Sequence, residues 1–82
     1  MAGTQDPHDG LAEEQQRILL RRALDELSEG ERIAIVLRDV EGLTTAEVAE
    51  ILQSPEATVR SRISRGRLKL KEAVDRMSRG IL

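Results

Sequence analysis

The chain has 82 residues, which is enough for one small domain with a thin core. It lacks cysteine and all three large aromatic residues, which excludes disulfides, cysteine-ligated metal and the stacking platforms of single-strand nucleic-acid binders. Its net charge of −2 is unevenly divided, since residues 1–56 hold five arginines against thirteen acidic residues and residues 57–82 hold eight lysines and arginines against two, a distribution typical of polyanion binding.

The first ten residues are polar and contain glycine and proline. We expect residues 1–10 to be a disordered leader or an expression remnant, and residues 11–82 to form the folded domain. His8, the one histidine, is expected to be solvated in this leader, so no metal site and no cofactor are expected. Because the chain shows no signal peptide and no apolar run of membrane-spanning length, we expect a cytoplasmic protein that does not bind membranes.

The first predicted helix runs from Leu11 to Leu27, with apolar residues at helical spacing at positions 20, 23, 24 and 27. Ser28 and Glu31 then fit a capping box, which predicts the start of a second helix. The apolar face of that helix is predicted from i, i+3, i+4, i+7 spacing, and it comprises Ile33, Val36, Leu37 and Val40. Gly42 is placed to end the helix in the left-handed conformation.

A third helix is predicted after Thr44, which forms a second capping box with Glu47. Leu43 and Val48 occupy the two positions of a hydrophobic staple around it. The inner face of the helix is predicted at Val48, Ala49 and Leu52. The segment Gln53-Ser54-Pro55 should end it, with Ser54 capping the next helix and Pro55 at its first position.

The fourth helix is predicted from Pro55 to about Met77 and has two distinct faces. One is a core stripe of Val59, Ile63, Gly66, Leu70, Val74 and Met77. The opposite arc holds Arg60, Ser61, Ser64, Arg65 and Leu68. Since no strand pattern occurs, the predicted fold class is all-α, a small four-helix domain with a C-terminal helix-turn-helix.

Two short helices joined by about three residues, the second basic on its outer arc, form the arrangement that places a helix in the DNA major groove. Arginines offer paired donors to guanine and serines donate or accept, so we expect base contacts at Arg60, Ser61, Ser64 and Arg65. Phosphate contacts are expected from the amino end of the preceding helix at Thr44 and Thr45, and from Arg62, Arg67, Lys69 and Lys71. The alternative is that the basic arc is merely a solvated face.

Some features of the chain bear on functions other than DNA binding. No general base accompanies the serines and no glycine-rich loop is present to hold a phosphate, so an enzyme is not expected. Ile18, Ile35 and Leu68 lie off the core stripes. They either touch a neighbouring helix or, for Ile18 and Ile35, belong to a partner surface, whereas Leu68 could touch a thymine methyl.

The chain resembles region 4 of bacterial sigma factors, especially the extracytoplasmic-function (ECF) group, over about residues 13–76. The resemblance rests on LSEGERIAIVLRDVEGL at 27–43, TTAEVAEIL at 44–52 and ATVRSRI at 57–63, with Arg65 and Arg67 beyond. It implies a winged-helix-like four-helix domain without strands that binds the promoter −35 element as double-stranded DNA. It also implies docking on the β-subunit flap of RNA polymerase and capture by an anti-sigma factor, and we expect the isolated domain to be monomeric.

The resemblance carries functional roles to matching positions. Arg60, Ser61, Ser64 and Arg65 would face bases, and Thr44, Thr45, Glu56, Thr58 and Arg62 would lie near the DNA backbone. Some positions depart from the family's usual residues. Gln53 replaces a usual glycine and is expected to adopt a positive φ, Ser64 stands where an aromatic residue or histidine is frequent, and Gly66 replaces a usual alanine.

Two other functions remain open. One is a response-regulator DNA-binding domain of the LuxR type, which usually carries histidine where Arg62 stands. The other is a sigma-like module that has lost DNA binding and acts as a decoy for anti-sigma factors, although the basic arc argues against it.

Overall fold

The computed structural model describes the backbone of residues 7–81 and the side chains of residues 12–80. The helices are α1 (Pro7–Asp25), α2 (Glu29–Ile35), α3 (Thr45–Leu52) and α4 (Glu56–Ile81), and α2 continues into a π-helical turn, η2 (Val36–Val40). No strand occurs in residues 7–81, which confirms the all-α prediction. No helix in this range is long and apolar enough to cross a membrane.

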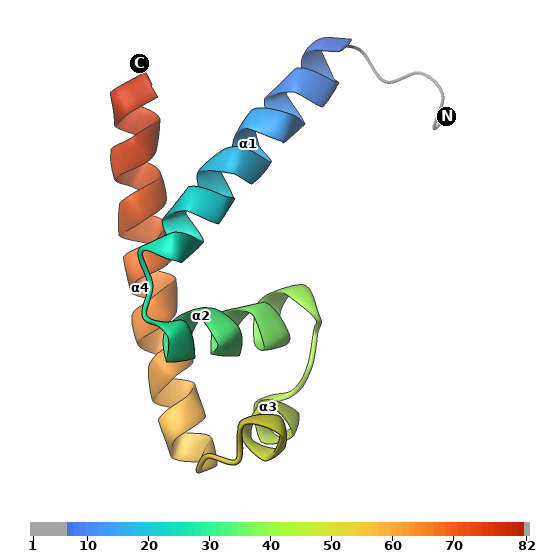
Figure 1. Cartoon of the computed structure of the whole chain (residues 1–82), viewed down its shortest axis with the longest axis vertical. Helices are drawn as coiled ribbons and strands as arrows, with labels where there is room; N and C mark the ends of the chain where they lie inside the picture. Colours follow the sequence, from blue (N-terminus) through green and yellow to red (C-terminus); the bar gives the residue numbers. More distant parts are fainter. Residues whose placement is uncertain (1–6, 82) are drawn as a thin grey trace.

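The long helix α4 is the axis of the molecule (Figure 1). α2 packs across its amino-terminal half, α3 lies beside that half, and α1 meets α4 near its middle, after which the two helices diverge toward the chain ends. The domain is flat, with principal extents of 44 × 33 × 14 Å. A layer this thin buries few side chains completely, and Val48 and Val59 are the largest of them.

Helix α1 begins at Pro7, inside the segment predicted to be a disordered leader. Proline suits the first turn of a helix, because its fixed φ is favourable there and its missing N–H is not needed. Residues 1–6 and the side chain of His8 lie outside the described residues.

Both predicted capping boxes are present. The Ser28 hydroxyl accepts from the Glu31 N–H at 3.2 Å, and the Glu31 carboxylate accepts from the Ser28 N–H at 3.0 Å. Thr44 and Glu47 make the same pair of bonds at 3.1 and 2.9 Å. Gly42 has φ of 77°, so the predicted left-handed end of the second helix is also confirmed.

The predicted apolar face of α2 is confirmed for Leu37, which packs against the core, but it is wrong for Ile33 and Val40. Ile33 is 37% exposed and Val40 67% exposed, whereas Ala34 is fully buried and Glu31 is only 6% exposed. The inward face therefore contains a charged residue and an alanine, which apolar periodicity does not detect. The π turn adds to the error, because its extra residue per turn changes the face on which residues beyond Val36 lie.

The prediction that Ile35 belongs to a partner surface is also wrong, because its side chain is 3% exposed. Ile35 packs against α4 at Gly66, where a Cβ would stand 2.4 Å from Ile35 Cδ1 and 3.3 Å from Glu31 Cβ. The absence of a side chain at Gly66 thus lets α2 approach α4 closely. This contact explains why a glycine is tolerated inside a helix despite its cost of about 1 kcal/mol relative to alanine.

Gly66→Ala and Ile35→Val are expected to be strongly coupled in stability. Alone, Gly66→Ala gains about 1 kcal/mol of helix propensity but loses a similar amount to overpacking, and Ile35→Val costs about 1 kcal/mol. Ile35→Val removes Cδ1, so Gly66→Ala should then stabilise the domain by about 1 kcal/mol. Urea unfolding of the four proteins in a double-mutant cycle measures this coupling, and additive effects would contradict the close contact.

The core is aliphatic, as the composition requires. It is centred between α2, α3 and α4 and consists of Ala34, Val48, Ala49, Val59 and Ile63, with Leu37, Leu43 and Leu52 packed around it. The predicted stripe of α4 is confirmed, since Val59, Ile63 and Gly66 are buried and Leu70, Val74 and Met77 are partly buried. This packing fixes the rotation of α4 and determines which of its residues face outward.

Candidate nucleic-acid interface

A three-residue turn at residues 53–55 joins α3 to α4. Gln53 has φ of 52° and ψ of 45°, which confirms the predicted left-handed conformation, a strain of about 1 kcal/mol for a residue other than glycine. The predicted cap at Ser54 is wrong. The helix starts at Glu56, and the Ser54 hydroxyl instead donates to the Leu52 carbonyl at 3.2 Å.

The outer arc of α4 presents the predicted base-reading residues together. Arg60, Ser64 and Arg65 are exposed and Ser61 is partly exposed. Arg65 Nη2 donates to Ser61 Oγ at 3.0 Å, and Arg60 Nη2 lies 3.2 Å from Glu56 Oε1. Such exposed contacts contribute little free energy, so these groups can exchange them for partners on DNA.

One flank of the arc faces the amino end of α3. A depression of about 250 Å³ lies there, lined by Arg38, Thr45, Arg60, Ile63, Ser64 and Arg67. It brings Thr45 beside Arg60 and Arg67, as expected for a path along which a DNA backbone could run. Thr44 is adjacent, but its hydroxyl is already used as the cap of α3.

Arg38 is a residue of this flank that the sequence reasoning missed. Its Nη1 donates to the Leu43 carbonyl at 3.2 Å, which holds the guanidinium beside the start of α3. Helical periodicity alone gives no reason to place Arg38 near Arg60, because the position depends on the π turn. Gly42 and the capping box at Thr44 predict where the second helix ends. They do not predict that its last turn is π-helical.

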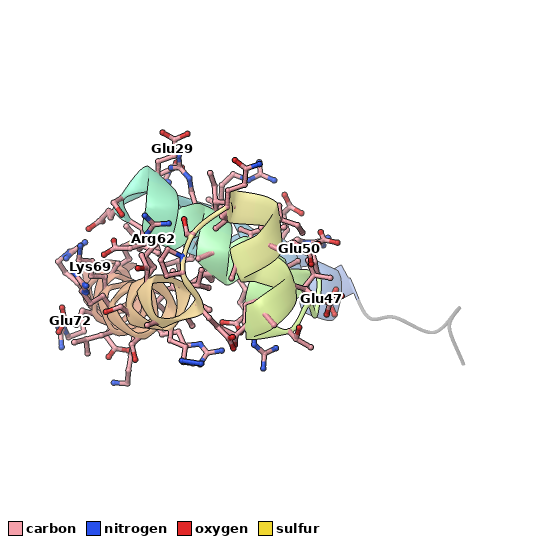
Figure 2. The ribbon with its side chains drawn as sticks, turned by 90° about the horizontal axis from the view of Figure 1, so that it is seen from below. Glu29, Glu47, Glu50, Arg62, Lys69 and Glu72 are labelled. Atoms are coloured by element: carbon pink, nitrogen blue, oxygen red, sulfur yellow. The ribbon has the colours of Figure 1, made fainter. Side chains whose placement is uncertain are left out.

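Arg62 lies on the other flank, turned toward α2. Its Nη1 donates to Ser54 Oγ at 3.4 Å, and a Cβ on Gly30 would lie 3.4 Å from its Nε. Figure 2 shows Arg62 between α4 and the start of α2, whereas Glu47 and Glu50 point away from α4. A second depression of about 410 Å³ surrounds it and includes Thr58, Ser61 and Arg65. Arg62 therefore links the turn to α2, and its partly buried position differs from that of a free phosphate ligand.

Lys69 and Arg67 are engaged in ion pairs with α2 and η2. Lys69 Nζ lies 3.0 Å from both carboxylate oxygens of the buried Glu31. Arg67 Nε donates to Asp39 Oδ2 at 3.0 Å, and Nη2 donates to Oδ1. The hydrogen bond from Lys69 is the main cause that holds the pKa of Glu31 below its ordinary value. Lys69 was predicted to contact a phosphate, but in the structure it joins α4 to α2 through Glu31.

The remaining predicted residues are exposed to different degrees. Lys71 Nζ lies 3.2 Å from Asp75 Oδ2, one turn further along α4. Glu56 is exposed at the amino end of α4, and Thr58 is partly exposed in the depression around Arg62. Leu68 is exposed on the outer arc, which agrees with its predicted position. Ile18 is 45% exposed on α1, far along the chain from this face.

Two helices joined by a tight left-handed turn, the second presenting arginines and serines outward, define a helix-turn-helix domain of the DNA-binding class. The chain belongs to the sigma-70 region 4 family, since the model described as "Sigma-70, region 4" matches residues 17–70. This finding confirms the family resemblance, and it favours neither the LuxR-type domain nor the decoy.

Individual relatives agree with this membership. The chain is 40% identical over 70 residues to the ECF RNA polymerase sigma-E factors of Escherichia coli (strain K12) and Salmonella typhi, covering 85% of this chain and 35% of each relative. It is 32% identical over 78 residues to the RNA polymerase sigma-H factor of Pseudomonas aeruginosa, covering 95% of this chain and 38% of that protein. The chain thus spans little more than a third of the length of these relatives.

Proposed function

We propose that this chain is the promoter-binding region 4 of an ECF sigma factor, in which α4 reads the −35 element of double-stranded DNA and no catalysis takes place. The observation that carries the proposal is the outer arc of α4, where Arg60, Ser61, Ser64 and Arg65 are presented side by side. Arginine pairs with the acceptor edge of guanine and serine bonds either donors or acceptors, so the arc can distinguish base pairs. The proposed site of action is the cytoplasm.

The DNA backbone is proposed to run on both sides of this arc. On one side lie Thr44, Thr45, Arg67 and Glu56, which is paired with Arg60, and on the other lies Thr58, with Lys71 further along α4. The amino end of α3 supports this assignment, because its unsatisfied N–H groups and partial positive charge favour a phosphate. Arg62 and Lys69 are the weakest members of the proposed set, since each is bound to another part of the domain.

A separate surface is proposed to dock on RNA polymerase. Where α1 and α4 diverge, a groove of about 480 Å³ is lined by Gln15, Ile18, Leu19, Arg22, Met77 and Gly80. Its largely apolar lining suits an apolar helix, and we propose the β-subunit flap as its occupant and an anti-sigma factor as a competitor for it. Ile18 thereby keeps its predicted place on a partner surface.

Selection of bound duplexes from a random pool tests the promoter-reading function. We expect a preferred sequence, and the logarithm of the binding constant should fall by about 0.9 per phosphate contact for each tenfold rise in salt. A duplex of shuffled sequence is the control. Equal binding to the two duplexes, or binding that does not respond to salt, would rule out the proposed function.

The variant Ile18→Asp separates the two surfaces. It should leave the affinity for the selected duplex unchanged and weaken capture of the domain by the isolated flap, because it places a charge in the apolar groove. Loss of DNA binding in this variant would mean that the groove and the DNA face are not independent.

A further inference from the structure

An acidic residue, Asp39, lies inside the positively charged flank of the proposed DNA face. Its carboxylate accepts two hydrogen bonds from Arg67, a residue 28 positions further along the chain on α4. Arg38 and Arg67 both line the depression beside Thr45, and both attract the Asp39 carboxylate electrostatically. A fixed negative charge at this place repels the phosphates that the flank is proposed to bind.

The π turn η2 gives Asp39 this position. Glu41 N–H donates to the Val36 carbonyl at 2.9 Å and Leu43 N–H to the Leu37 carbonyl at 3.1 Å, so the end of the helix is wider than an α-helical turn. Arg38 and Asp39 are consecutive, yet Arg38 reaches the Leu43 carbonyl at the start of α3 while Asp39 reaches α4. The turn thus places a cation and an anion together on the flank.

The carboxylate offsets much of the positive charge there. Arg60 is paired with Glu56 and Arg67 with Asp39, whereas Arg38 makes no ion pair within the described part of the chain. The pKa of Asp39 is held below its ordinary value, first by the hydrogen bonds from Arg67 and then by the charges of Arg67 and Arg38. Asp39 is therefore ionised at neutral pH, where it competes with a phosphate for the Arg67 guanidinium.

We propose that Asp39 is an electrostatic brake on DNA binding, which occupies Arg67 in the free domain and lowers the affinity for every duplex. The inference rests on the proposed function, because it takes α4 as the DNA-reading helix. The brake acts on a phosphate contact, which carries no sequence information, so it reduces binding to any duplex by the same factor. The base contacts of the outer arc then determine where the domain stays bound.

Asp39→Asn tests the proposal, with the selected duplex and the shuffled duplex as probes. Asp39→Asn releases one arginine for one phosphate contact, so the slope of log K against log salt should become steeper by about 0.9. If the variant and the unchanged protein bind equally at 1 M salt, the variant should bind about fivefold more tightly near 0.15 M. The gain should be equal for the two duplexes. Unchanged or lower affinity in the folded variant would overturn the proposal.

Glu26→Gln is the matched control. Glu26 is a surface carboxylate paired with Arg76, so this substitution removes the same charge as Asp39→Asn but at a place away from the flank. It should change the affinity by less than about twofold, because charges more than a Debye length apart are screened. An equal gain in Glu26→Gln would show that only net charge matters and would overturn the role of Asp39.

Arg67→Ala provides a second test when it is combined with Asp39→Asn. The double variant should lose the whole gain of about fivefold, because Arg67 is the group that Asp39→Asn releases. A gain that persists without Arg67 would overturn the brake. A failed selection would instead count against promoter reading, and the shuffled duplex would still report on Asp39.

Discussion

Replacing Arg60 or Arg65 by alanine should abolish most of the preference of the domain for its selected duplex. Each arginine lies on the outer arc of α4, where it can exchange its exposed partner, Glu56 or Ser61, for a guanine. A bidentate pair contributes about 1 to 3 kcal/mol of discrimination, or roughly 5- to 150-fold. The two residues lie five positions apart on one helix, so they should read neighbouring base pairs. Competition binding against the shuffled duplex measures the preference directly.

Arg76→Ala is the control for these two substitutions. Arg76 is on the same helix and carries the same charge, but it is paired with Glu26 beside α1, away from the outer arc. It should leave the preference unchanged. If Arg60→Ala and Arg65→Ala weaken both duplexes by the same factor, the two arginines bind phosphates, and base reading must lie elsewhere on α4.

The Ser64 position sharpens this expectation. A serine beside Arg60 and Arg67 leaves the depression on that flank open, whereas the aromatic residue or histidine that the family resemblance leads us to expect at this position would partly fill it. Contact with a base through serine needs a closer approach of α4 to the groove. The preference should therefore depend more on the two arginines here than it would with an aromatic residue at position 64.

Local signals were sufficient to predict the starts of α2 and α3 and the left-handed residues that follow η2 and α3. Both capping boxes, the left-handed Gly42 and the strained Gln53 depend on a few consecutive residues, and the structure has all of them. The core stripe of α4 was also predictable, since that helix is long and regular. Its outward face followed from the stripe by geometry alone, so the exposed arc of the candidate site could be predicted.

Contacts between distant segments could not be predicted. Glu31 was recognised as part of a capping box, but nothing local shows that its carboxylate also meets Lys69, 38 positions away. With Glu31 on the buried face of α2, Ile35 faces Gly66 and Ile33 faces outward. The same limit applies to Arg38 and Asp39, whose places on the DNA flank depend on a π turn that no periodicity reveals.

The ion pair between the buried Glu31 and the half-exposed Lys69 is expected to give the largest stability effect of any charged contact described above. Glu31→Gln keeps the capping box, because glutamine can accept from the Ser28 N–H, and it loses only the ionic part of the contact. Lys69→Met leaves a buried carboxylate without its cation, which is the more costly change. At neutral pH we therefore expect the highest Tm for the unchanged protein, a lower Tm for Glu31→Gln and the lowest for Lys69→Met. The control Arg76→Met should have a Tm close to that of the unchanged protein.

The pH dependence of the Tm has a defined sign. The folded-state pKa of Glu31 lies below its ordinary value of 4.5, so its ionised form stabilises the fold at higher pH. That stabilisation should be lost as the pH falls below 4.5 and through the lowered folded-state value, and thermal unfolding followed by circular dichroism measures it. Glu31→Gln should show a flatter curve in this range, and an unchanged curve would mean that Glu31 does not pair with Lys69 in solution.

Lys69 also allows its packing role to be separated from a role on DNA. If its ammonium serves only Glu31, Lys69→Met in the folded state should bind duplexes with an unchanged salt dependence, despite its lower Tm. If it contacts a phosphate, the slope of log K against log salt should decrease by about 0.9. Lys71→Met is the comparison, because Lys71 is paired only with the exposed Asp75 and can leave it at little cost. If the slope decreases for Lys71→Met but not for Lys69→Met, Lys71 contacts a phosphate and Lys69 serves only Glu31. The edge of the DNA face on α4 would then lie between these two residues.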